Sequence, residues 1–449
     1  DAYFDQWRHR FDLFHPERPF YQVDDPRVQP KSVVSLKYGV GFLHDQHFDH
    51  DGEATGFSFS PGQAAQAVVT LQAFGLGGLS GIEEKHTDAP CANGVVFFVR
   101  GDTLKETLLL NMPAYPQELF FRHTDGDAPS WEQENPFADA RTSPNGLLDY
   151  LTWQSRRPFL YPRRTEGGDV VVADYKLGPG LRLSDDDSDP QKLYFSSKQS
   201  GILPLRFDED KALWRDSAAL FSFGSLDEDG TRAPAAFRWL ALLIQELEDA
   251  IYLPKEKTYH YLALGLAKNR GKMLFARHET LPLPTDYLAD TNLVRRLASA
   301  LATAETVARD LLRAVRVAGM HLHLAQPEQV SWRSYGIHLH APTAIKKVAE
   351  DEINGWVQHS GVERAYWAAL DVPYQSFMVR LPAERDDALI GWQRQVRDAA
   401  FAAFDLIHQY TPDKGRSLKA DVHGRAALAA SLHKSLPLLY SLPIQEPTP

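Results

Sequence analysis

The sequence contains very little cysteine, no long apolar run and no excess of positive charge. Cys91 is the single cysteine in 449 residues, so a framework of intramolecular disulfides is excluded and a reducing, cytoplasmic setting fits. No run of about 18 apolar residues occurs, so we expect no membrane-spanning helix. The chain starts at Asp1 without a charged-then-apolar leader. Because an initiator Met is missing, we expect further residues to precede it.

Recognisable catalytic motifs are also missing. The chain has no G-x-S-x-G, Walker A or H-E-x-x-H pattern, and no cysteine–histidine nucleophile pair. The acidic triplet at 185–187 lies in a loop-like stretch, where solvated carboxylates are the simpler interpretation. We therefore expect a protein that is not an enzyme and that needs neither a cofactor nor a metal.

The net charge limits the kind of nucleic-acid binding that is possible. Proteins that bind DNA alone are normally basic, because counterion release from phosphates supplies much of their affinity. This chain carries a formal net charge of −11. A nucleic-acid role is therefore compatible only with a few local contacts, with partner subunits supplying the rest of the affinity.

Length and local patterns predict an α+β fold in the first part of the chain. At 449 residues, with 43% hydrophobic and 24% charged residues, two globular domains are expected. Ser60 and Gln63 form a capping box that predicts a helix ending at Gly75. Thr103 and Glu106 predict a second capped helix. Strands are expected at 95–99, 170–173, 193–195 and 259–263, and a buried helix at 235–251.

The last third of the chain changes character. Leu293, Leu297 and Leu301 open a stripe at steps of three and four that predicts a long helix, and Gly319 is expected to end it. Similar stripes at 345–370, 389–407 and 425–436, with no strand expected between them, predict a four-helix bundle.

A proline-rich stretch at 281–284 predicts the linker before the bundle. We therefore expect an irregular mixed α+β domain over 1–284, followed by a C-terminal four-helix bundle over 285–449.

Two histidine pairs support the main alternative function. His321 and His323, like His338 and His340, are two residues apart, and on a strand such a pair would point to one side and could bind zinc. A metal-dependent hydrolase therefore remains open. The other interpretation is a hairpin-like insertion between two helices, with histidines as ordinary polar residues.

Two further clusters have a simple structural interpretation. The segment 44–51 is dense in histidine and aspartate, but no strand register would hold a metal site there, so a solvated loop is favoured. Gly75, Gly77 and Gly78 follow a helix, whereas the glycines of a phosphate loop follow a strand. A helix C-cap explains Gly75 alone. A glycine run also permits close approach of the backbone to a partner, and a DNA groove is one such partner.

Several motifs occur together and in order. They are FDLF at 11–14, HPERPFYQ at 15–22, FDH at 48–50, QAFGLGG at 72–78, RGDTLKETLLLN at 100–111, LTWQSRR at 151–157 and ALWRD at 212–216. Together they resemble the CasA family, the large subunit of the type I-E CRISPR Cascade surveillance complex. The resemblance covers essentially the whole chain, most strongly up to about residue 220.

The resemblance implies a function without catalysis. Members of this family lie beside the 5′ handle of the guide RNA and probe duplex DNA for the protospacer-adjacent motif. They begin strand separation and R-loop formation, and they recruit the helicase-nuclease. Sequence recognition itself is left to the guide. The implied partners are the guide RNA, motif-bearing double-stranded DNA, the backbone and small subunits, and the helicase-nuclease effector.

The resemblance also implies DNA-binding residues. Gly75, Gly77 and Gly78 correspond to a glycine loop that probes the minor groove, where tolerant reading is expected. A wedge that opens the duplex corresponds to Asn269, Arg270 and Gly271, with Arg270 where the family often has Gln. The lysine finger corresponds to Lys176, and Lys192 is the alternative.

Contacts with the guide RNA and the displaced strand are implied in the same way. The loop 44–55 corresponds to the family loop that reaches the guide, with Phe48 stacking on a base and His47 and His50 meeting phosphate or sugar. The bundle is expected to face the small subunits and the displaced strand. Its candidate phosphate contacts are Arg295, Arg296, Lys346 and Lys347.

Overall fold

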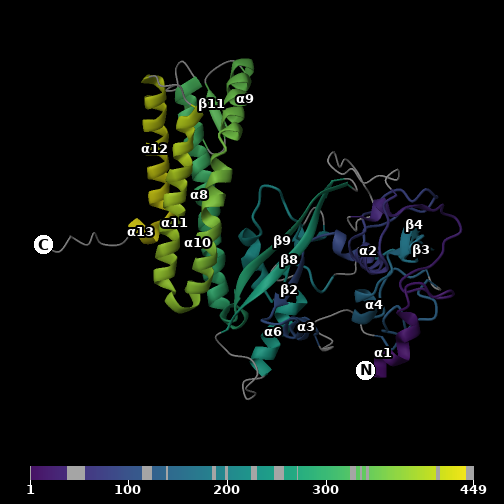
Figure 1. The fold of residues 1–449 in the computed structure, drawn as a ribbon. Coiled ribbons are helices and arrows are strands. Elements are labelled where there is room, and N and C mark those ends of the chain that lie inside the picture. Colours follow the sequence, from purple (N-terminus) through teal and green to yellow (C-terminus); the bar gives the residue numbers. More distant parts are fainter. Residues whose placement is uncertain are drawn as a thin grey trace. The chain divides into compact units, whose positions relative to one another are not determined.

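The computed structural model combines helices and small sheets, with a helical C-terminal region (Figure 1). This confirms the α+β fold class. The described residues are 2–37, 56–113, 124–137, 140–184, 189–197, 201–223, 230–246, 257–269, 272–323, 330–333, 336–339, 343–410 and 415–440.

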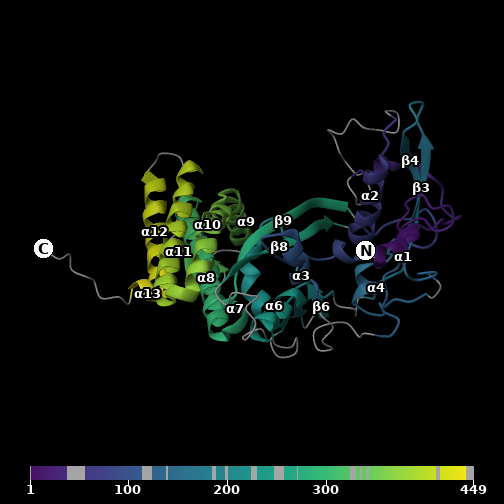
Figure 2. The same ribbon diagram turned by 60° about the horizontal axis from the view of Figure 1, so that its bottom comes forward.

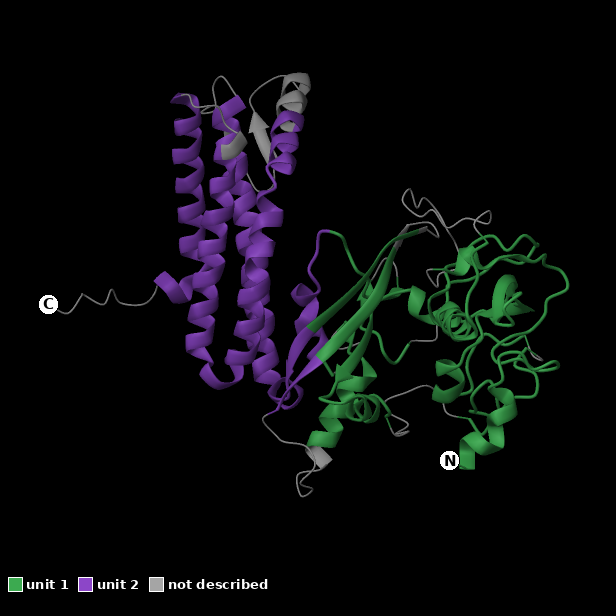
Figure 3. Ribbon diagram, in the orientation of Figure 1, with its two compact units in different colours: residues 1–209, 222–246, 261–280 green, residues 210–221, 247–260, 281–449 purple. Residues whose placement is uncertain are grey.

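Two compact units divide the chain (Figure 3). Unit 1 comprises 1–209, 222–246 and 261–280, and unit 2 comprises 210–221, 247–260 and 281–449. The segments 210–221 and 247–260 thus belong to unit 2, although they precede residue 284. The domain boundary expected between 284 and 285 stays a prediction.

Most described strands belong to three three-stranded sheets, with orders β1-β4-β3, β6-β5-β7 and β2-β8-β9. The pair β3–β4 is antiparallel, with Arg156 opposite Pro179 and a register shift after Tyr161. Strand bounds are β1 Lys31–Ser32, β2 Val96–Arg100, β3 Arg156–Arg164, β4 Val170–Pro179, β5 Tyr194–Ser197, β6 Gly201–Pro204, β7 Thr231–Arg232, β8 Thr258–Asn269 and β9 Lys272–Pro284.

The described part of unit 1 also contains short helices. They are α1 Ala2–Trp7, α2 Pro61–Phe74, α3 Leu104–Leu110, α4 Leu147–Leu151 and α6 Ala235–Glu246. The predicted capping box is confirmed, because Ser60 Oγ accepts from the Gln63 amide and Gln63 Oε1 accepts from the Ser60 amide. Leu71 of α2 packs with Val172 and Tyr175 of β4 in one buried cluster. This packing fixes the end of α2 beside the start of β3.

Unit 2 contains a bundle of four long helices, α8 Thr291–His323, α10 Val362–Glu384, α11 Asp386–Asp405 and α12 Gly415–Ser435 (Figures 1 and 2). Its core is aromatic: the ring of Trp214 stacks on Tyr374 with centroids 4.5 Å apart. The indole Nε1 of Trp392 donates to the Ala300 carbonyl at 3.0 Å. Such partners satisfy the polar ends of buried aromatic side chains. Shorter helices are α7 Asp286–Ala289, α9 Thr343–His359 and α13 Pro437–Tyr440.

The single helix expected at 345–370 is wrong. Two helices, α9 and α10, occupy this region and are separated at Gly361, whose φ is 66°. The expectation of no strand between the helices is also wrong, because β10 (Val330–Arg333) pairs antiparallel with β11 (Gly336–Leu339) between α8 and α9. A stripe of apolar residues continues across such a break, so periodicity alone could not detect it.

Two expectations about helix and strand ends are also corrected. Gly319 does not end its helix, because α8 continues to His323. A Cβ at Gly319 would lie 2.9 Å from Trp356 of α9, so this glycine permits close helix packing. The stretch 281–284 is not a linker but the end of β9, where Leu281 and Leu283 are buried.

Candidate nucleic-acid interface

A buried arginine anchors the start of the glycine run. Arg156, at the start of β3, is 1% exposed and donates from Nη2 to the carbonyls of Gly75 and Leu76, both at 2.9 Å. The side chain of Gln72 in turn bonds the backbone of Arg156, accepting from its amide at 3.0 Å and donating to its carbonyl at 2.9 Å. The carbonyls that follow the last turn of α2 are therefore satisfied inside the protein.

The charge of Arg156 persists at neutral pH. Burial lowers the pKa of this guanidinium to about 10, and the charge of Asp88 opposes the change. A cation on these carbonyls strengthens their hydrogen bonds. The base of the glycine segment is consequently a rigid part of unit 1.

The remaining glycines close the base of a loop. The backbones of Gly78 and His86 exchange two hydrogen bonds, at 3.0 and 2.9 Å. The Gly77 amide donates to Asp88 Oδ1 at 2.9 Å. A Cβ at Gly75 would lie 2.6 Å from the Leu71 carbonyl, which no side chain tolerates. Close internal packing therefore accounts for Gly75, and the residues 79–85 form the part of the loop that projects.

The tip of this loop contains two large apolar residues, of which Leu79 is exposed and Ile82 is half-buried. Leu79 is 78% exposed, and Gly81 has a φ of 86° with open space around it. Glu83 and Lys85 are exposed as well. We call residues 79–85 the tip loop. Within it, Ser80 Oγ accepts from the Ile82 amide and donates to the Glu84 carbonyl, so the tip loop is held by its own hydrogen bonds while most of its residues are exposed.

Arg27 reduces the negative charge beside the tip loop. Its guanidinium lies 2.7 Å from Asp25 and 2.7 Å from Glu84. Hydrogen bonds from Arg27 lower the pKa of Glu84 and of Asp25, and the charge of Arg157 acts in the same direction on both. Phosphate would meet less repulsion here than the acidic sequence of the loop indicates.

The two candidate lysines have protein partners. Lys176 Nζ lies 2.8 Å from Asp24 Oδ1, and this hydrogen bond raises the pKa of the lysine. Lys192 is buried, lies 3.1 Å from Asp189 and donates to the Pro90 carbonyl at 2.6 Å. A phosphate could take the place of Asp24 at the Lys176 ammonium group, whereas Lys192 is buried inside unit 1.

Other predicted site residues lie partly or wholly outside the described residues. Asn269 ends β8 and Lys272 begins β9, so the strands on either side of the wedge are placed. Arg270 and Gly271 lie outside the described residues, as do His47, Phe48 and His50.

Comparison with known proteins places the chain in a family. The family described as CRISPR-associated protein Cse1 matches residues 1–403. The chain belongs to the Cse1 family. The resemblance to CasA that the motifs indicated is thereby confirmed. The CasA/Cse1 protein of Thermus thermophilus is 31% identical over 443 residues, covering 94% of this chain and 79% of that protein.

Solved Cse1 structures share the fold. The crystal structure of Thermus thermophilus CasA superimposes with a TM-score of 0.74 at 27% identity, covering 96% of this chain and 82% of that chain. A structure described as a CRISPR RNA-guided surveillance complex gives a TM-score of 0.65 at 23% identity, covering 96% and 81%. The second likeness supports the fold alone.

The first histidine pair of this Cse1-family chain does not have the geometry of a zinc pair. His321 and His323 lie in the last turn of helix α8, where residues two apart point about 200° apart. The strand geometry considered for them is therefore wrong. The His321 ring stacks on His423 of α12, with centroids 4.0 Å apart. His338 lies on β11 and His340 outside the described residues. Among the described residues, no group of three or more potential ligands could hold a metal.

Sequence reasoning missed the residues that hold the glycine segment. Arg156, Asp88 and His86 lie far from Gly75 in sequence or look like surface residues. The signal that could have identified Arg156 is its position at the start of a strand, next to residues that are buried. The family resemblance pointed to the glycines, and the structure shows which residues hold them.

Among the described helices, none has the length and apolar character needed to cross a membrane.

Proposed function

We propose that the chain is the large, non-enzymatic subunit of an RNA-guided CRISPR surveillance complex, and that it probes DNA for the protospacer-adjacent motif. Membership of the Cse1 family and the 31% identity to the CasA/Cse1 protein of Thermus thermophilus support this. The observation that carries the proposal is the tip loop, whose base is closed by Gly78 and His86 and whose residues Leu79, Gly81, Glu83 and Lys85 are exposed. The glycine loop of the proposal is thus Gly75, Gly77 and Gly78 with the tip that they support.

The chemistry of the tip loop suits tolerant reading of a groove. The minor groove presents a degenerate pattern, so a backbone probe distinguishes A·T from G·C and little more. An exposed apolar side chain, Leu79, can enter between base steps, as apolar wedges do in minor-groove binders. A rigid base lowers the entropy lost on binding.

The remaining elements complete the proposal. The wedge at the end of the β8–β9 pair, with Asn269, Arg270 and Gly271, opens the duplex and begins the R-loop. Lys176 contacts phosphate in place of Asp24. The loop with His47, Phe48 and His50 meets the 5′ handle of the guide RNA. The helical bundle binds the small subunit, and backbone subunits and the helicase-nuclease are further partners.

The test is a charge at the tip loop of the assembled complex. Leu79→Asp places a carboxylate where the proposal puts DNA, and we expect affinity for a motif-bearing target duplex to fall by at least about tenfold. Affinity should be measured by titration of labelled duplexes with and without the motif. Leu104→Asp is the matched control, because Leu104 is 75% exposed in the same unit but belongs to α3.

Two outcomes would count against the proposal. Unchanged affinity of Leu79→Asp for motif-bearing DNA would show that the tip loop does not read the motif. An equal loss in Leu104→Asp would show only general repulsion by added charge.

A further inference from the structure

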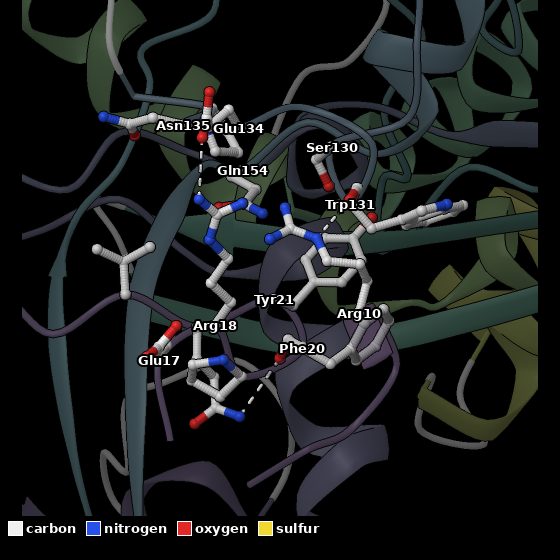
Figure 4. Close-up of a pocket in the computed structure, with 14 residues that line it drawn as sticks. Arg10, Glu17, Arg18, Phe20, Tyr21, Ser130, Trp131, Glu134, Asn135 and Gln154 are labelled. Atoms are coloured by element: carbon white, nitrogen blue, oxygen red, sulfur yellow. Dashed lines mark hydrogen bonds and ion pairs between the residues drawn. The ribbon is translucent and has the colours of Figure 1, made fainter. Parts of the chain in front are cut away.

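A polar cavity of about 210 Å³ opens in unit 1, between the N-terminal segment and the segment that precedes β3 (Figure 4). None of the glycine-run or tip-loop residues lines it. Its polar side chains include Arg10, Arg18 and Gln154, and Tyr21 and Trp131 contribute aromatic walls. Figure 4 shows the two guanidinium groups facing the same space, with Gln154 beside Arg18.

Arg10 is a buried cation held by backbone carbonyls. The residue is 9% exposed, and it donates from Nε to the Trp131 carbonyl at 2.6 Å and from Nη2 to the Gln133 carbonyl at 2.7 Å. Within the described part of the chain, no carboxylate forms an ion pair with it. Burial first, and then the charge of Arg18, lower the pKa of Arg10. A buried guanidinium, that of Arg10, and an exposed one, that of Arg18, thus face one space, as at sites that bind an anion.

Two carboxylates, those of Glu17 and Glu134, also line the cavity, and both residues are exposed. Arg18 Nη2 lies 3.1 Å from Glu134 Oε1, but the Glu134 side chain is 87% exposed. An ion pair at this exposure contributes little. An incoming anion can therefore replace Glu134 at Arg18 at low cost.

Gln154 adds an amide oxygen that the protein itself does not use. The residue is 6% exposed, and its buried Oε1 accepts no hydrogen bond from any described group. Leaving such a group unsatisfied is unfavourable for folding. Tyr21, which also lines the cavity, has a φ of 57°, in the left-handed region that residues other than glycine rarely adopt. Both features are typical of residues retained for binding.

We propose that this cavity binds one nucleotide of a single-stranded nucleic acid, with its phosphate between Arg10 and Arg18. Guanidinium groups match phosphate oxygens in pairs, and the Gln154 amide can accept from a sugar hydroxyl or from the edge of a base. The Trp131 side chain lines the wall against which a base can rest. The strand is guide RNA or separated DNA, which share this chemistry.

The site can be tested on the purified full chain, independently of motif recognition. Adenosine 5′-monophosphate is titrated by isothermal calorimetry into wild type, Arg18→Gln and Gln154→Leu. We expect binding about tenfold weaker in each variant, because each lacks one side-chain group that would hydrogen-bond to the ligand. Because Gln154 Oε1 has no described partner, Gln154→Leu should have a melting temperature equal to or above that of wild type. Arg380→Gln is the matched control, since Arg380 is also paired with a glutamate at the surface.

Other probes identify the ligand class. Stronger binding of adenosine 5′-monophosphate than of its 2′-deoxy form indicates RNA as the source, and equal binding admits DNA. If inorganic phosphate binds as tightly as adenosine 5′-monophosphate, the cavity is a general anion site and the proposal is overturned. Tighter binding of N-acetylaspartate would overturn it too, by indicating a protein carboxylate instead. Unchanged affinity in both cavity variants would also overturn it.

Discussion

At the scale of single residues, buried polar groups decide the shape of the candidate interface. Arg156 is buried on two carbonyls of the glycine run, and Gly75 occupies a position where any Cβ would collide with the Leu71 carbonyl. Gly77 and Gly78 use their backbone groups on Asp88 and His86. Close packing therefore requires glycine at position 75, and the exposed residues lie beyond the glycines, in the tip loop.

His86 should make stability depend on pH. Burial, followed by the charges of Arg156 and Lys31, lowers its pKa to about 3, whereas an unfolded histidine has a pKa of about 6.5. Below about pH 6.5 the unfolded chain binds a proton that the native chain does not. The free energy of unfolding contributed by this residue is therefore lost as pH falls, by about 1.4 kcal/mol per pH unit.

The corresponding variant is His86→Gln, which cannot titrate. Between pH 6.5 and 5 the free energy of unfolding of wild type should decrease. For the variant we expect this decrease to be smaller by up to about 2 kcal/mol. Urea denaturation at both pH values measures this. An equal decrease in the two proteins would show that other groups govern the acid sensitivity.

At the scale of elements, breaks between helices depend on backbone conformation more than on apolar pattern. Gly361 adopts a φ of 66° between α9 and α10, and Ser360 Oγ accepts from the Val362 amide at 3.4 Å. The left-handed conformation costs a residue with a Cβ roughly 1 kcal/mol. This one residue redirects the chain between two helices that share an apolar stripe.

Two glycine substitutions separate this effect from general helix propensity. Gly361→Ala should lower the free energy of unfolding by about 1 kcal/mol, because alanine is strained at this φ. Gly355→Ala, within α9 and with nothing within 4 Å of an added Cβ, should raise it by about 0.5–1 kcal/mol. Thermal or urea unfolding of both variants is the measurement. Stabilisation by both would contradict a conformational role for Gly361.

At the scale of the whole molecule, the charge of −11 makes the chain a poor DNA binder by itself. Lys176, the candidate phosphate contact, is held by Asp24 at 2.8 Å. The proposed role is therefore credible only inside a complex, where other subunits supply electrostatic affinity. The cavity that brings Arg10 and Arg18 together is a local feature that the overall charge conceals.

The salt dependence of DNA binding should reveal the contribution of Lys176. If this lysine contacts one phosphate in the complex, Lys176→Ala should reduce the slope of log affinity against log salt by about 0.9. Titrations of the assembled complex with motif-bearing duplex at several salt concentrations measure the slope. Lys105→Ala, an exposed lysine of α3, is the control. Equal slopes for Lys176→Ala and wild type would exclude the phosphate contact.

The sequence by itself determined features that depend on residues close together along the chain. The capping box at Ser60, the helix opened by Thr103 and the long α8 followed from local hydrogen bonds and from periodicity. The family also followed from the sequence, because its motifs are contiguous. The caps and the helical periodicity depend on interactions between residues within about one helical turn of each other.

Only the tertiary structure decided what each predicted site residue touches. Arg156 reaches Gly75 across 81 positions of the chain, and Lys176 reaches Asp24 across 152. A hydrogen bond over such a separation forms only after the packing of α2, β3 and β4 has brought its two ends together. For the same reason the convergence of Arg10 and Arg18 with Gln154 could not be predicted from any motif. Local sequence sets the elements, and the packing of their apolar faces sets which polar groups meet.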